Sequence, residues 1–237
     1  MTIVGAPAGS VTIEGWQRSE VDVSADVELH ASTTEDLDRL ALVNSFVLDQ
    51  DSNHLRIITT GTHDRSFMRR VGKNFPKALK GLPWRIDYRI KVPSNTDLDV
   101  NSGLGAIKLS GVEGILRLNA IESNADLSLT GGDASIIIQR GTVNVDIPTR
   151  SWRGLGARVQ LAGGNLNVAL VPGFNGDIDA DVLRNGEVKN SYSNLEPRDR
   201  NSITARSLRA RAGGGGSTLS FTVGDGLIQI KQIGSQQ

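Results

Sequence analysis

The chain lacks cysteine, has few aromatic residues and carries no net charge, and each of these features excludes some functions. It contains no cysteine, which excludes disulfides, thiolate catalysis and cysteine metal sites. Aromatic residues make up only 4% of its 237 residues, so the core must be built from valine, isoleucine and leucine, a composition that suits thin β layers. The formal net charge is zero, so no overall field draws the chain to nucleic acid or to a membrane.

Long apolar runs are absent as well. No segment approaches the length of a transmembrane helix. Residues 1–9 lack the basic and apolar regions of a signal peptide. We therefore expect either a cytoplasmic protein or one in which Met1 replaces a removed leader.

Residues 1–95 are predicted to form a β-strand region. Apolar residues of segment 21–29 occupy every second position, with acidic or polar side chains between them, as in a half-buried strand. A short helix is expected to begin near Thr34, which would cap it. Segments 41–48 and 55–59 flank a polar turn and predict a hairpin. Segment 84–92 alternates again.

Residues 60–83 interrupt this pattern. Phe67, Val71 and Phe75 recur near helical spacing, while Gly72 and Pro76 argue against one continuous helix. The sequence therefore predicts a partly helical insertion.

Residues 96–230 carry a weak internal repeat. Two short apolar-alternating segments recur at roughly 20 residues, the range typical of solenoids. Two or three apolar residues cannot form a core alone, but stacked copies about 4.8 Å apart would build continuous aliphatic ladders. The first segments centre on Leu98/Val100, Leu116/Leu118, Ile136/Ile138, Val159/Leu161, Ile178/Ala180 and Leu219/Phe221. The second segments centre on Ile107/Leu109, Leu127/Leu129, Val143/Val145, Leu166/Val168 and Ile228/Ile230.

Glycine marks the bend between the two segments of a turn. It stands two positions before the second segment at Gly105, Gly141, Gly164 and Gly226, where a positive φ or a close backbone approach is expected. In one turn Asn124 would take this role by adopting the left-handed region. Residues 181–207 form a polar excursion from the ladder, and the last strands, within 219–230, are expected to cap the stack.

Three sequence elements resemble the bacterial putative-adhesin β-strand-repeat family, whose domains have no known function. They are GSVTIEGW with EVDV at residues 9–16 and 20–23, IKVP before DLDV at 90–93 and 97–100, and the closing GDGLIQI at 224–230. The resemblance covers almost the whole chain. It implies a right-handed parallel β-solenoid, here of about six short rungs after the N-terminal region, and an envelope or extracellular setting. It implies no catalytic residues. We expect a single elongated domain, 1–237.

Charge is unevenly distributed along the chain. Residues 61–91 hold nine basic and two acidic side chains, a local excess of seven positive charges. This segment could contact an anionic glycan, a cell-wall polymer, a lipid surface or a protein, with no specific nucleic acid expected. Alternatively, the basic strand 84–92 pairs with an acidic strand such as 21–29. The candidate binding residues are Arg65, Arg69, Arg70, Lys73, Lys77 and Lys80.

Metal and catalytic signals are weak. Asp177, Asp179 and Asp181 alternate with apolar residues, so their carboxylates project to one side, where they either bind Ca²⁺ or form a solvated face. The histidines at positions 30, 54 and 63 have no metal-ligand spacing. The sequence contains no nucleophile elbow and no phosphate-binding glycine loop. We therefore predict no metal, no cofactor and no enzymatic activity.

Three functions remain open at this stage. The first is a non-enzymatic envelope or surface module, an adhesin-like protein that binds through a strand-built wall. The second is a polysaccharide-active enzyme on a β-solenoid. The third is a scaffold that assembles end to end, because exposed terminal strands can template strand addition.

Overall fold

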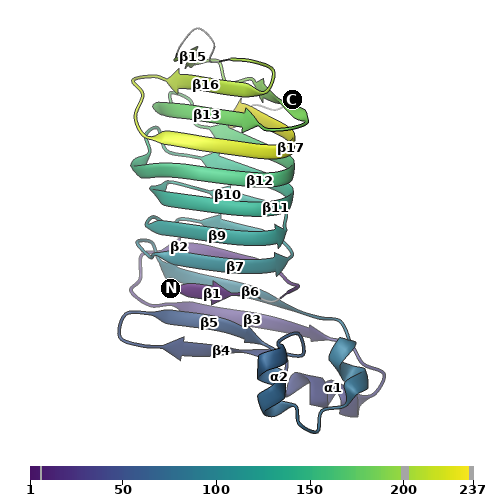
Figure 1. Cartoon of the computed structure of the whole chain (residues 1–237). Coiled ribbons are helices and arrows are strands. Elements are labelled where there is room, and N and C mark those ends of the chain that lie inside the picture. Colours follow the sequence, from purple (N-terminus) through teal and green to yellow (C-terminus); the bar gives the residue numbers. More distant parts are fainter. Residues whose placement is uncertain (6, 199–202, 235–237) are drawn as a thin grey trace.

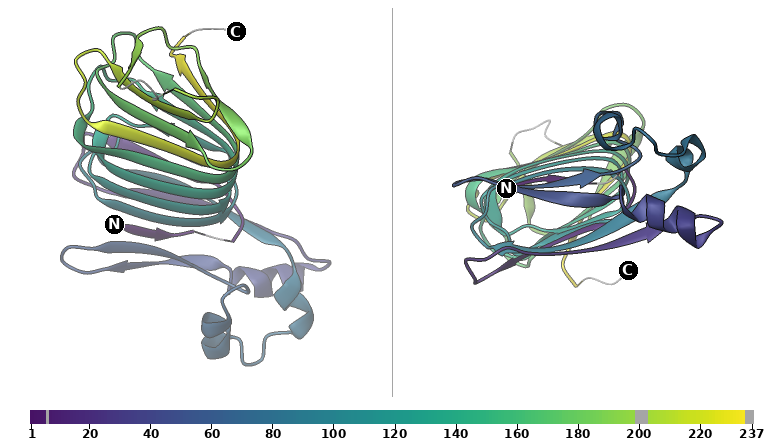
Figure 2. Two further views of the ribbon diagram at one scale, coloured as in Figure 1. Left: turned by 45° about the horizontal axis from the view of Figure 1, so that its top comes forward. Right: turned by 90° about the horizontal axis from the view of Figure 1, so that it is seen from below.

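The computed structural model describes residues 1–5, 7–198 and 203–234. Strands account for 60% of the structure and helices for 9%. In this part of the chain 17 strands join one mixed sheet, which curves almost closed around an apolar core (Figure 1, Figure 2). The prediction of a mostly β chain with a small helical part is confirmed.

The strands form two walls that face each other across this core. The first wall contains, in spatial order, β4 (Ser45–Gln50), β5 (Leu55–Thr60), β1 (Thr2–Val4), β7 (Leu98–Leu104), β9 (Ile115–Glu122), the first halves of β11 (Gly131–Ile147), β12 (Arg153–Leu170) and β17 (Thr218–Gln232), then β13 (Gly176–Val182), β16 (Ser207–Ala212) and β15 (Leu195–Pro197). The second wall contains β3 (Asp22–Leu29), β6 (Trp84–Pro93), β2 (Val11–Trp16), β8 (Ile107–Ser110), β10 (Ala125–Ser128), the second halves of β11, β12 and β17, and β14 (Gly186–Asn190).

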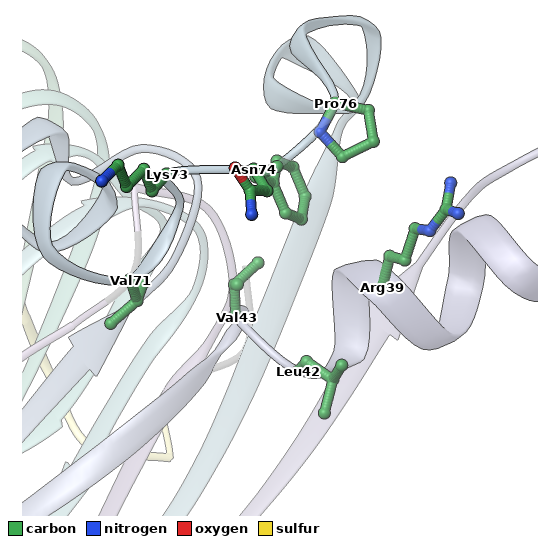
Figure 3. A pocket seen from close by; sticks show the side chains of 8 residues that line it. Arg39, Leu42, Val43, Val71, Lys73, Asn74 and Pro76 are labelled. Carbon is green, nitrogen blue, oxygen red and sulfur yellow. The ribbon is translucent and has the colours of Figure 1, made fainter.

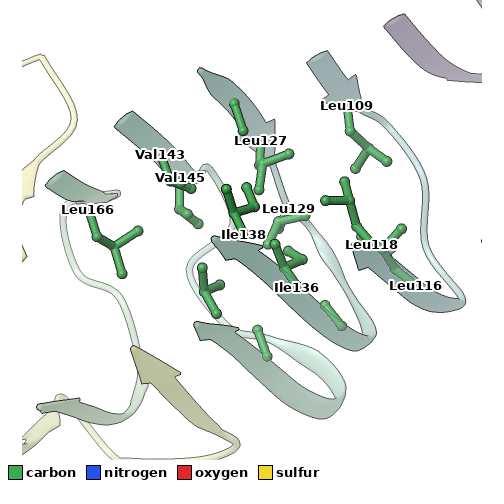
Figure 4. Close-up of a cluster of buried hydrophobic side chains, with 14 of the residues drawn as sticks. Leu109, Leu116, Leu118, Leu127, Leu129, Ile136, Ile138, Val143, Val145 and Leu166 are labelled. Atoms are coloured by element: carbon green, nitrogen blue, oxygen red, sulfur yellow. The ribbon is translucent and has the colours of Figure 1, made fainter. Parts of the chain in front are cut away.

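Parallel, in-register pairing along the middle of both walls stacks inward side chains in columns. One column of the first wall runs through Leu118, Ile136, Val159, Phe221 and Ala180, each at most 1% exposed. Figure 4 shows part of this packing. Burying one such large side chain stabilises the fold by roughly 1.5–3 kcal/mol. The buried cluster is continuous from Ile3 to Ile230.

Several predicted pairings are shifted by two residues. Leu127 lies opposite Leu109 and Val145, whereas the sequence pattern aligned it with Ile107 and Val143. Leu116 lies opposite Ala134, and Leu118 lies opposite Ile136, whereas the sequence pattern aligned Leu116 with Ile136. Ala134 is 3% exposed and fills an inward position, but alanine is a weak hydrophobic signal in a sequence. The pattern therefore missed the first inward residue of this turn.

The corner glycines behave as predicted. Gly105, Gly141, Gly164 and Gly226 have φ of 142°, 136°, 134° and 144°. A Cβ on Gly164 would lie 1.9 Å from the carbonyl oxygen of Gly141 in the neighbouring turn. Both the backbone conformation and the close approach therefore require glycine.

The corner without glycine differs from its prediction. Ser123 occupies the glycine position there, because the Cβ of Gly141 would meet its carbonyl oxygen. No non-glycine residue among those described has a positive φ, so Asn124 does not adopt the left-handed region. Instead, its Oδ1 accepts a hydrogen bond from the Thr142 N–H at 3.2 Å and links the turn to the next one.

Both terminal segments of the described chain are inserted into the stack. β17 lies between β12 and the β13/β14 turn, so the prediction that segment 219–230 caps the stack is wrong. The antiparallel strands β16 and β15 cover β13 instead. At the other end, β1 lies between β5 and β7, and β2 lies between β6 and β8. The excursion 181–207 contributes β14 to the stack, and its residues 199–202 lie outside the described residues.

The remaining elements gather at the end of the stack beside β4 and β5 (Figure 1). They are α1 (Thr34–Ala41), α2 (Arg65–Val71) and the 3-10 helix η1 (Lys77–Gly81). The partly helical insertion and the β4–β5 hairpin are thus confirmed. Helix α1 is capped by Thr33, whose Oγ1 accepts from the Asp36 N–H at 3.2 Å, and not by Thr34.

Candidate anionic-partner site

The nine basic residues of segment 61–91 fall into two groups. Those on β6 are matched by acids on neighbouring strands. The Arg85 guanidinium lies 2.7 Å from Glu28, and that of Arg89 lies 2.6 Å from Asp26, both on the antiparallel strand β3. The predicted pairing of strand 84–92 with strand 21–29 is therefore confirmed, and it accounts for these charges.

The other group consists of the six predicted binding residues. They lie on α2, on the link after it and on η1, and all six are exposed. Within the described part of the chain, none of them forms an ion pair. The structure thus leaves a local positive charge at the end of the stack: Arg65, Arg69, Arg70, Lys73, Lys77 and Lys80.

Helix α2 is fixed by its own cap and by a buried side chain. Asp64 Oδ1 accepts from the N–H groups of Phe67 at 3.0 Å and Ser66 at 2.8 Å. These backbone hydrogen bonds, the one from Phe67 first, lower the pKa of Asp64, and Arg70 adds to the effect. Met68 is 6% exposed and anchors the inner side of the helix. The cations on either side of Met68 therefore project into solvent.

Four of the six residues line one hollow of about 450 Å³, here called the basic hollow. Arg70 and Lys77 are not among its lining residues. The hollow lies between the start of α2, its C-terminal glycine and η1. Its lining is Thr62, Arg65, Met68, Arg69, Gly72, Lys73 and Lys80.

A second hollow of about 480 Å³ lies beside it, between the end of α1 and the link from α2 to η1 (Figure 3). We call it the apolar hollow. Lys73 lines both hollows, so they adjoin. Leu42 is 84% exposed and Val71 is 52% exposed at its wall. The other lining residues are Arg39, Val43, Asn74, Phe75 and Pro76.

A partly buried hydrogen bond links the two sides of this region. Asn44 is only 2% exposed and comes directly after Val43, which lines the apolar hollow. Its Oδ1 accepts a hydrogen bond at 2.9 Å from the N–H of Thr62, which lines the basic hollow. His63 packs on Trp84, with ring centroids 5.4 Å apart, and burial lowers its pKa. The residues that flank the two hollows are therefore connected to each other and to β6.

The acidic row of β13 has partners that the sequence did not reveal. Arg211 Nε lies 3.0 Å from Asp177, Arg198 pairs with Asp179, and the Ser207 hydroxyl donates to Asp181 at 2.6 Å. Antiparallel pairing places Arg211 and Ser207 of β16 opposite Asp177 and Asp181, while Arg198 follows β15. The row is therefore not simply a solvated face, because each of its three carboxylates has a basic or hydroxyl partner. The Asp177 carboxylate also raises the pKa of Arg211 through their hydrogen bond.

The three histidines are dispersed. His30 contacts Glu28 at 3.0 Å, and His54 contacts the Thr2 hydroxyl at 2.7 Å. In residues 1–5, 7–198 and 203–234, no group of three or more His, Asp or Glu side chains could hold a metal ion.

Outward polar residues of the second wall also stack in register. Asn144 Nδ2 donates to Asp126 at 2.8 Å, and Asn167 Nδ2 donates to Asn144 Oδ1 at 2.9 Å. They border a shallow hollow of about 370 Å³ that Asp126 and Asn144 help to line. Because these side chains bond to each other, we interpret the row as an amide ladder that supports the wall.

Comparison with known proteins leaves the family unassigned. No protein-family model matches the chain. No curated protein matches it. A crystal structure of a putative cell adhesion protein from Clostridium sporogenes ATCC 15579 is similar, with 13% identity, a TM-score of 0.48, and coverage of 98% of this chain and 90% of that one. Among the described helices, none is both long and apolar enough to cross a membrane.

Proposed function

We propose that the chain is a non-enzymatic module of the bacterial cell envelope or surface, adhesin-like, that binds an anionic partner. Its scaffold is a single elongated right-handed parallel β-solenoid of about six short rungs. In-register parallel columns support this scaffold. The binding element is the set of six exposed cations on α2, the following link and η1.

One observation carries this proposal: some cations of the chain form ion pairs with carboxylates, and others do not. The cations of β6 and of β16 meet carboxylates, which makes them part of the scaffold. The six cations at the end of the stack form no ion pair in the described residues, although Arg70 helps to lower the pKa of Asp64. Like charges kept close together without counter-charges create a positive local potential, which attracts a polyanion.

One end of the stack argues against end-to-end assembly. The short antiparallel strands β15 and β16 cover that end, whereas at the opposite end the outer edge of β4 has no partner strand among the described residues and the helices lie to one side of it (Figure 1). Irregular or covered edges are the usual protection against strand addition. We therefore place the partner at the cations and not at a strand edge.

A soluble polyanion tests the proposal. Dextran sulfate binding should be measured by calorimetry at low and high salt for wild type and for Arg69→Gln/Lys73→Gln. The matched control is Arg117→Gln/Arg158→Gln, which removes two exposed cations from the first wall. We expect salt-sensitive binding that the first pair of changes weakens and the control pair does not. Equal weakening by both pairs, or binding insensitive to salt, would refute the proposal.

A further inference from the structure

We infer that the anionic partner is the surface of a phospholipid bilayer with net negative charge. Headgroup phosphates occupy the basic hollow, while Leu42 and Val71 enter the boundary of the acyl chains. This inference rests on the proposed function and names the partner of the same site.

The two adjoining hollows carry the inference, because together they match both parts of a lipid. The basic hollow presents Arg65, Arg69, Lys73 and Lys80, and guanidinium and ammonium groups are the usual ligands of phosphate oxygens. The apolar hollow begins at Lys73, which lines both. A long lysine side chain at such a boundary can lay its stem on apolar surface while its charge stays with the headgroups.

Exposed apolar side chains separate a bilayer from other polyanions. Leu42 is 84% exposed and Val71 is 52% exposed, directly beside the cations. A polysaccharide or a nucleic acid would neutralise the cations but leave both aliphatic side chains in water. A bilayer buries them as well, and membrane affinity grows with both buried apolar area and attraction to anionic lipid.

The position of the site permits contact with a flat surface. Helices α1 and α2 lie at the end of the stack and to one side of it (Figure 1, Figure 2). The apolar hollow lies between α1 and the link after α2, and Figure 3 shows Leu42 and Val71 on opposite sides of it. The two walls of the sheet therefore do not stand between this end and a membrane.

The acidic residues of α1 do not cancel the local charge. Arg39 lies 2.6 Å from Glu35 and 3.4 Å from Asp36 and offsets one of the three acids of this helix, which leaves two negative charges on α1 against the six cations. Leu42 stands at the other end of α1, as its C-cap. The face offered to the bilayer therefore combines the end of α1 with the cations of α2 and η1.

The absence of cysteine allows a direct test of insertion. A single cysteine at Leu42→Cys can carry an environment-sensitive fluorophore, with Leu155→Cys as the matched control. Leu155 is 83% exposed but lies on β12, away from the cations. With vesicles of phosphatidylglycerol and phosphatidylcholine, we expect a blue shift at position 42 and none at position 155. Vesicles of phosphatidylcholine alone should shift neither.

Sedimentation with the same vesicles tests the role of each hollow. Leu42→Ser/Val71→Ser should weaken vesicle binding roughly tenfold, the size expected when two aliphatic side chains lose partial burial. Dextran sulfate binding should not change, and Leu155→Ser should affect neither. Arg69→Gln/Lys73→Gln should weaken both kinds of binding.

The outcomes separate the inference from the proposed function. Binding to dextran sulfate without binding to anionic vesicles would overturn the lipid inference and leave the proposed function standing. Vesicle binding without a fluorescence shift at position 42 would overturn insertion, and so would equal binding to neutral and anionic vesicles. Failure to bind either partner would overturn both proposals.

Discussion

Replacing a single corner glycine tests whether close stacking of the turns holds the fold together. Gly164 has a φ of 134°, and a Cβ there would lie 1.9 Å from the Gly141 carbonyl oxygen. Gly164→Ala must therefore take a strained backbone conformation and also push the neighbouring turn away.

The expected magnitude follows from these two costs. A non-glycine residue in a rarely populated backbone region costs about 1–3 kcal/mol. The contact with the Gly141 oxygen adds to this, because it is backbone and cannot rotate aside. We expect Gly164→Ala to lower the free energy of unfolding by about 3 kcal/mol or more, because substitutions that strain the backbone are among those with large losses of stability. Urea unfolding followed by tryptophan fluorescence and circular dichroism measures this change.

Two other glycines separate the costs. Gly173 has a φ of 75° but no atom within 4 Å of an added Cβ, so Gly173→Ala carries only the backbone cost, about 1–2 kcal/mol. Gly163 adjoins Gly164, and its added Cβ would lie 3.9 Å from the backbone carbonyl oxygen of Asp225. Gly163→Ala should therefore leave the free energy of unfolding nearly unchanged. A loss at Gly164→Ala no greater than that at Gly173→Ala would refute the reasoning.

Three further predictions concern the charges and the chain order. Burial would raise the pKa of Asp87, but hydrogen bonds from the Ser10 N–H and hydroxyl, each at 2.7 Å, together with nearby arginines hold it below its usual value. Asp87 therefore stabilises the fold above its unfolded pKa of about 3.9, and this stabilisation is lost as the pH falls through its lower folded pKa. The urea midpoints of wild type and Asp87→Asn should accordingly converge in acid. A difference between the two midpoints that persists unchanged in acid would contradict this. Arg211→Ala should lower the urea midpoint because it removes the 3.0 Å contact with Asp177, and added Ca²⁺ should not restore it; restoration by Ca²⁺ would revive the metal hypothesis. Deleting residues 218–237 should make segment 171–217 rapidly sensitive to proteolysis, because β17 lies between β12 and β13; a deletion product that is as protease-resistant as wild type would show that β17 only caps the stack.

Local patterns predicted the strands and corners well. Segment 84–92 alternates strictly, and Trp84, Ile86, Tyr88, Ile90 and Val92 are all buried, because side chains of a strand point alternately to its two faces. Corner glycines were predictable for a similar reason, since only glycine takes a positive φ at no steric cost.

The order of the turns could not be predicted in the same way. Each turn offers similar short aliphatic pairs, so the aliphatic pattern alone does not say whether β13 or β17 lies beside β12. Sequence order suggested that β13 follows β12, yet β17 takes that place. The column of inward side chains has little specificity of its own, because aliphatic packing depends on volume and not on identity.

The candidate site was predictable only in part. The excess of cations in segment 61–91 was visible in the sequence, but two interpretations of it remained open. Antiparallel pairing of β3 with β6 assigned Arg85 and Arg89 to the scaffold and separated them from the six cations beyond. Nothing in the sequence indicated that Leu42 and Val71 are exposed, since an isolated aliphatic residue near a helix end is usually buried.

The sequence by itself determined the local geometry of this protein. Period-two alternation set the strands, glycine set the corners, and the scarcity of aromatic residues required an aliphatic core. Tertiary structure alone decided which turns are neighbours, which charges meet a partner and which apolar side chains stay in water. The physical reason is the sequence separation over which each interaction acts. Backbone preference acts within a few residues, whereas ion pairing and burial depend on segments brought together from distant parts of the chain.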